Sequence, residues 1–160
     1  MADLLDQLEH DHAPLTASLE ELAEHVRAVQ QEGRTPADVH GGFSETVEEF
    51  RDDLLEHFGR EEECLFPFLV EALPELADEI AALEAGHDQI CGGVVRLAHL
   101  ADRDPRAFTG VWVQVLHTFE RFDAAYREHA RVERALLQRA VRSLNSEQRA
   151  ALRRAEQGLI

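Results

Sequence analysis

The sequence predicts an all-α fold: an up-down-up-down four-helix bundle followed by a short C-terminal helix. Apolar residues recur at spacings of three and four along most of the chain, as in Leu15, Leu19 and Leu22, which is the pattern of amphipathic helices. The alternation of apolar and polar residues that is typical of strands is not found. Four long helical patterns joined by short links favour antiparallel neighbours around one core.

Prolines and glycines delimit the first two predicted helices. The first begins or kinks at Pro14, which cannot donate a backbone hydrogen bond, and ends at Gly33. Thr35-Pro36 and Ser44 are both candidate starts for the second helix. This helix is expected to be disturbed near Pro67.

The remaining helices have equally clear start signals. A third helix follows Pro74, and Asp104-Pro105 opens a long fourth helix whose apolar stripe reaches Leu137. The segment Asn145-Ser146-Glu147 is a typical start for a short terminal helix that ends at Gly158.

Size and composition predict one domain, residues 1–160, with the bundle at about 4–144 and the terminal helix at about 146–157. The chain lacks an apolar run long enough to span a bilayer, and its first residues lack a signal-peptide pattern. Cys64 and Cys91 are too few for a disulfide scaffold. We therefore expect a cytoplasmic protein without a membrane partner.

The formal net charge of −16 argues against a nucleic-acid partner. Residues 121–160, by contrast, are rich in arginine, and this end either docks a partner or lies against the acidic helices and solvent. The chain contains no lysine, which excludes Schiff-base chemistry. No serine or cysteine has a recognisable base, so a hydrolase is disfavoured. The oligomeric state is not predicted.

Two phrases place a histidine and a glutamate one helical turn apart: His57 and Glu61 in HFGRE, and His129 and Glu133 in HARVE. Residues i and i+4 lie on the same helix face, so each pair points a nitrogen and an oxygen at one spot. His57 and His129 also continue apolar stripes, which turns both pairs toward the core. Buried imidazole and carboxylate are costly unless something satisfies them.

Each pair has a further histidine upstream. His12 precedes His57 by 45 residues, and His87 precedes His129 by 42, so the chain reads as two similar halves. Four nitrogens and two carboxylates suit a pair of iron or manganese ions, and zinc is also possible. A core imidazole bonded to a neighbouring carboxylate explains any one of these histidines more simply, but not the whole pattern.

These residues resemble the hemerythrin-like (HHE cation-binding) family, four-helix bundles that hold a non-haem di-iron centre. The resemblance covers roughly residues 4–140, and HFGREEECLFP is its most specific phrase. It implies four nitrogen ligands, His12, His57, His87 and His129, and two carboxylates that bridge the irons, Glu61 and Glu133. From the helices that are expected to be neighbours, we place His12 and His57 on one iron and His87 and His129 on the other.

Two departures from the oxygen-carrying members bear on function. Those members have a further histidine one turn from the third-helix ligand, where His87 has Leu83 and Cys91, and an aspartate in the last motif, which here is HARVE. Fewer ligands leave open positions, which catalytic and sensing sites keep. The expected function is therefore to bind or react with O2, peroxide or NO, in sensing, detoxification or storage. Whether this includes enzymatic turnover stays open.

Other interpretations remain. Glu9 with His12 and Glu84 with His87 have the Glu-x-x-His spacing of ferritin-like di-iron carboxylate proteins. His10 competes with His12 as the first ligand. A metal-free helical module that binds a partner is the alternative from another class, but it leaves the inward histidines and glutamates unexplained.

Four residues near the motifs could each play either of two roles. Tyr126 is either core packing or a hydrogen-bond donor to a bound ligand, and Cys91 is either a small buried apolar residue or a redox or ligand residue. Glu62 and Glu63 are either a solvated flank or a means of orienting or replacing Glu61.

Overall fold

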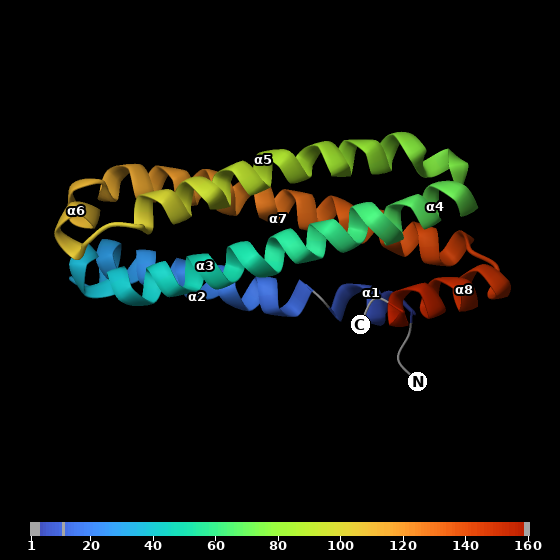
Figure 1. Cartoon of the computed structure of the whole chain (residues 1–160), viewed down its shortest axis with the longest axis horizontal. Helices are drawn as coiled ribbons and strands as arrows, with labels where there is room; N and C mark the ends of the chain where they lie inside the picture. The colour runs from blue at the N-terminus through green and yellow to red at the C-terminus, as the bar shows by residue number, and fades with distance from the viewer. Residues whose placement is uncertain (1–3, 11, 159–160) are drawn as a thin grey trace.

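The computed structural model describes residues 4–10 and 12–158, and this part of the chain forms helices and short links without strands. The predicted all-α class is confirmed. Successive long helices lie side by side and alternate in direction, as the colour order in Figure 1 shows. These helices are α2 (His12–Gln31), α3 (Pro36–Arg60), α5 (Ala77–Ala101) and α7 (Trp112–Ser143). Among the described helices, none combines the length and the apolar character needed to cross a membrane.

Shorter elements lie at the two ends of these long helices (Figure 1). The π-helical turn η1 continues directly from α3, and a 3-10 turn, η2, leads into α5. The bounds of the shorter elements are α1 (Leu4–His10), η1 (Glu61–Leu65), α4 (Phe66–Ala72), η2 (Pro74–Leu76), α6 (Pro105–Gly110) and α8 (Ser146–Gln157).

The second predicted helix starts at the earlier of its two candidate sites. Thr35 caps α3, because its side-chain oxygen accepts from the Asp38 N–H at 3.2 Å and its own N–H donates to the Asp38 carboxylate at 3.0 Å. This reciprocal capping box satisfies backbone donors that the first helical turn leaves free. Gly33, at φ 73°, makes the preceding turn in a conformation that favours glycine.

The single fourth helix predicted from Asp104-Pro105 was wrong. The structure has two helices there, α6 and α7, separated at Val111 by a turn in which the Val111 N–H donates to the Phe108 carbonyl at 3.1 Å. Gly110 weakens helical continuity at this point. The break lets α6 pack on α3 and buries Phe108 against Phe43, with ring centroids 5.6 Å apart.

Two apolar clusters form the core, and buried polar residues lie between them. The first contains Phe50 and Tyr126, whose ring centroids are 5.7 Å apart, and the second contains Leu83 and Leu136. Along each of the three helical segments that cross this boundary, histidine or glutamate separates the two clusters. The buried polar side chains at the boundary are His57, Glu61, His87, His129 and Glu133.

Candidate metal centre

The six side chains predicted as ligands come together in two clusters that share Glu61. Four elements supply them: the start of α2, the end of α3 with η1, the middle of α5 and the middle of α7. Within each cluster the possible ligand atoms all lie within 4.8 Å of one another. The first cluster is His12, His57, Glu61 and Glu133, and the second is Glu61, His87 and His129.

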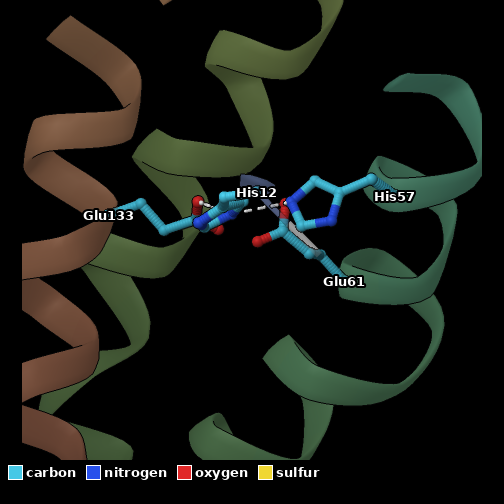
Figure 2. A group of neighbouring side chains, drawn as sticks. All are labelled: His12, His57, Glu61 and Glu133. Atoms are coloured by element: carbon cyan, nitrogen blue, oxygen red, sulfur yellow. Dashed lines mark hydrogen bonds and ion pairs between the residues drawn. The ribbon is translucent and has the colours of Figure 1, made fainter. Parts of the chain in front are cut away.

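In the first cluster, the side chains converge from separate helices, as Figure 2 shows. His12 Nε2 lies 3.0 Å from His57 Nε2 and 3.1 Å from Glu133 Oε2. His57 Nε2 lies 3.2 Å from Glu61 Oε1. Two imidazole nitrogens and two carboxylates therefore face one small volume, which is the chemistry of a site for a divalent transition metal.

The second cluster is more deeply packed. His87 Nε2 lies 3.4 Å from Glu61 Oε1, and the His87 and His129 rings are 5.0 Å apart. Phe58 stacks on His87 with ring centroids 3.7 Å apart and planes at 9°. On its other edge, His87 Nδ1 lies 3.0 Å from Glu62 Oε1. A carboxylate in this position fixes the tautomer that leaves Nε2 facing inward.

Several of these inward atoms have no hydrogen-bond partner. Burying a polar atom without a hydrogen-bond partner costs free energy, and such atoms are rare in folded proteins. A cation between them would satisfy them together, and nitrogens and carboxylate oxygens are suitable donors for it. The unpartnered atoms that face the two clusters are Glu61 Oε1, His87 Nε2, His129 Nε2 and Glu133 Oε1.

The electrostatics of the clusters favour ligand forms of two residues. Burial opposes ionisation of Glu61, but the close approach of His57 Nε2 and His87 Nε2, 3.2 and 3.4 Å from Glu61 Oε1, outweighs it and lowers the pKa of Glu61 to about 2. Burial and the neighbouring His87 lower the pKa of His129 to about 4, so its imidazole is neutral at pH 7. Burial alone would lower the pKa of His87, but Glu61 and Glu62 raise it.

The π turn that begins at Glu61 explains how the chain passes Pro67 beside the site. The Glu61 N–H still bonds to the carbonyls of His57 and Phe58, so the two ligand residues keep helical spacing. The Phe66 N–H then bonds to the Glu61 carbonyl, one residue further than in an α-helix. Pro67 therefore falls in the first turn of α4, where its missing N–H costs little.

The ferritin-like alternative is not supported by the positions of its glutamates. Glu9 and Glu84 belong to neither cluster, and Glu9 Oε1 instead lies 3.2 Å from Arg134 Nε. His10 is exposed, whereas His12 lies in the first cluster. The structure thus separates the residues that the sequence left as alternatives.

Tyr126 and Cys91, whose roles the sequence left undecided, both pack against apolar side chains. Tyr126 is buried between Phe50 and Phe122, and burial together with the charge of Glu61 raises its pKa. Cys91 packs against the first apolar cluster, and burial raises the pKa of its thiol.

Sequence reasoning did not connect Gly86 with His129, and it left the role of Glu62 undecided. A Cβ at Gly86 would lie 3.1 Å from His129 Nδ1, so glycine lets that imidazole lie against α5. Glu62 follows Glu61 directly and contacts His87 from a different element. The adjacency of Gly86 and His87 in the sequence was the available signal, but only the helix packing shows that the glycine serves His129.

Comparison with known families places the chain beside metal-binding proteins. The family model described as the hemerythrin HHE cation binding domain matches residues 3–155. Searches of curated proteins and of solved structures gave no match.

Proposed function

The chain belongs to the hemerythrin HHE cation-binding domain family, and we propose that it holds a pair of non-haem iron ions with which it binds or reacts with O2, peroxide or NO. We further propose that the four long helices form the up-down-up-down bundle of a single cytoplasmic domain. One observation carries the proposal: two buried clusters of imidazole and carboxylate share Glu61 and leave inward nitrogens and oxygens without hydrogen-bond partners.

The clusters divide the ligands between two ions. His12, His57 and Glu133 would hold one, and His87 and His129 would hold the other. Glu61 belongs to both clusters, so it is the carboxylate best placed to bridge. Glu133 belongs to the first cluster only. The family binds cations, and the mixed donor set suits iron, with manganese or zinc as competitors.

Iron bound there would supply open coordination positions and redox chemistry toward a small oxidant or diatomic gas. The residues around it do the positioning. Glu62 holds His87 in one tautomer, and Phe58 fixes the plane of that ring. The Tyr126 hydroxyl keeps its proton at pH 7, as a phenol ordinarily does, and burial together with the charge of Glu61 raises its pKa further. The hydroxyl is therefore available as a hydrogen-bond donor near Glu61.

The test is metal content and spectroscopy of the purified protein. The protein is expressed with added iron, the iron per chain is counted, and the visible spectrum is recorded in air and with azide. A pair of irons per chain with charge-transfer bands that azide shifts would support the di-iron site. Separate spectra with O2, peroxide and NO then test reactivity, and silence toward all three would refute that part alone.

Metal loading also distinguishes this proposal from the metal-free module and from the ferritin-like ligand set. Negligible iron after anaerobic loading would favour a metal-free helical module that binds a partner. A Glu84→Ala variant that loses metal would favour the ferritin-like ligand set, and we expect it to retain metal because Glu84 lies outside both clusters.

A further inference from the structure

A groove between α5 and α7 is lined by basic side chains and by no acidic ones, unlike the metal centre. It encloses about 280 Å³ and its floor is formed by Ile90 and Phe122. Its polar rim is Gln89, Arg96, Thr118 and Arg121. In a chain with a net charge of −16, none of the residues that line this groove is acidic.

Other hollows of the structure contain glutamate. Glu71 and Glu147 line the one beside Phe68, and Glu79 and Glu128 line the one beside His129. The absence of a carboxylate from the α5–α7 groove is therefore a local property and not the general character of the surface.

The two arginines of the groove differ from other surface arginines in their interactions. Arg96 and Arg121 make no hydrogen bond or ion pair with any residue in 4–10 or 12–158. Other surface arginines do: Arg131 lies 2.6 Å from Glu128, and Arg139 lies 2.9 Å from Glu79. Two free guanidinium groups that line the same groove, one from each helix, offer donors matched to the oxygens of phosphate or carboxylate.

Two adjacent glycines create the space. A Cβ at Gly93 would lie 3.0 Å from Phe122 Cδ2, so glycine is required for α5 and α7 to approach. A Cβ at Gly92 would meet nothing within 4 Å, so the missing side chain leaves an open hollow. Both glycines weaken the helix relative to alanine. Helix packing requires a glycine at position 93 but not at position 92.

We propose that the α5–α7 groove binds a small organic anion, a phosphate or carboxylate attached to a compact apolar group. The anionic oxygens accept hydrogen bonds from Arg96 and Arg121, and the apolar group rests on Ile90 and Phe122. The volume lies at the lower end of ligand sites, which limits the ligand to a small molecule. The site does not use the metal ligands, so it stands or falls independently of the iron proposal.

The experiment titrates the intact protein with phenyl phosphate, benzoate and, as the uncharged comparison, phenol, at low salt. Arginine side-chain N–H signals in NMR spectra report the contact, and calorimetry gives the Kd. We expect phenyl phosphate or benzoate to shift the Arg96 and Arg121 signals, and phenol not to shift them. Comparison of the two anions tells phosphate from carboxylate.

Matched variants distinguish binding in the groove from a general effect of charge. Arg96→Gln and Arg121→Gln should each raise the Kd roughly tenfold or more, because each removes charge-assisted hydrogen bonds. Arg142→Gln removes the same charge from outside the groove and should leave the Kd nearly unchanged. Gly92→Leu fills the hollow without altering charge and should abolish binding while the far-UV circular dichroism is kept.

Two outcomes would overturn the proposal. One is that neither anion shifts the Arg96 or Arg121 signals at millimolar concentration. The other is that Arg142→Gln weakens binding as much as Arg96→Gln does, which would show that the anions respond only to overall charge.

Discussion

The two ligand clusters differ in how firmly the protein holds them before metal arrives. The first depends on His12, the opening residue of α2, whose side chain is 19% exposed. The second depends on His87, which is 2% exposed in the middle of α5, stacked on Phe58 and bonded to Glu62. We infer that a ligand inside a helix is held more rigidly before metal binds than a ligand at a helix end.

Glu61 joins the clusters, and its removal should have the largest effect. Glu61→Ala takes a carboxylate from both, so we expect both ions to be lost. The gain in folding stability on adding iron should then disappear, which amounts to about 3 kcal/mol for each ion, or roughly 5 kcal/mol for two, when free iron is about 100 times its Kd. For a chain of 160 residues this is a Tm difference of roughly 10–20 °C.

Calorimetric unfolding with and without iron measures this effect. Glu63→Ala is the matched control, since Glu63 is an exposed carboxylate two residues away that belongs to neither cluster. An iron-dependent Tm rise that persists in Glu61→Ala would break the idea that the clusters share this ligand.

His12→Ala and His87→Ala test the contrast between the clusters directly. Each should lose the ion of its own cluster, but their effects on the metal-free protein should differ. His87→Ala leaves a cavity beneath Phe58 and should destabilise the fold by on the order of 2 kcal/mol or more. His12→Ala removes a partly exposed side chain at a helix end and should cost less than about 1 kcal/mol.

Urea unfolding of the two metal-free variants measures the difference. Equal destabilisation would mean that the first cluster is as rigidly held as the second, and the contrast between helix end and helix interior would have to be abandoned.

Glu62→Gln tests the second cluster alone, because it changes the partner of His87 and leaves every candidate ligand in place. The amide can orient to accept from His87 Nδ1 but brings no negative charge, so ligand basicity falls. We expect iron affinity at the second cluster to fall roughly 10–100-fold. Folding stability should change by less than about 1 kcal/mol, since the Glu62 side chain is 46% exposed.

Competition with a chelator, followed by iron counts, resolves the two ions. Glu63→Gln, the neighbouring change of the same kind, should release iron as the unaltered protein does. If Glu62→Gln weakened both ions equally, Glu62 would be acting through the overall charge of the site and not through His87.

Local signals in the sequence predicted most of the helix boundaries. Thr35 and Asn145 cap helices through capping boxes whose two residues lie only three positions apart in the sequence, so propensity and structure agree. The break at Val111 was not predictable in the same way, because it depends on Phe108 reaching Phe43 far away in the chain. Tertiary packing, which periodicity does not contain, decided that element.

In the candidate site, too, contacts within one helix were predictable and contacts between helices were not. The spacing of His57 and Glu61 on one helix face follows from helical geometry, and the structure keeps it. The contact of Glu62 with His87 crosses between elements, so the sequence left Glu62 with several possible roles. The sharing of Glu61 between clusters also depends on how three helices pack, which the spacing alone does not give.

Gly86→Ala should have the smallest effect and isolates how α5 positions a ligand on α7. Alanine is favoured over glycine in a helix by about 1 kcal/mol, but its Cβ would lie 3.1 Å from His129 Nδ1. The two effects oppose each other, so the stability of the metal-free protein should change little. The displaced imidazole, however, should release iron from the second cluster a few-fold faster, because ligand geometry is set within about 0.5 Å.

Gly92→Ala is the matched control on the same helix, since a Cβ there would meet nothing within 4 Å. It should gain the helical stability without altering iron release, measured as the rate of transfer to a chelator. Faster release in Gly92→Ala as well would mean that the flexibility of α5 governs the site. Faster release in Gly86→Ala alone would show that the close approach of α5 to His129 holds this ligand in place, which is the rigidity that distinguishes the second cluster from the first.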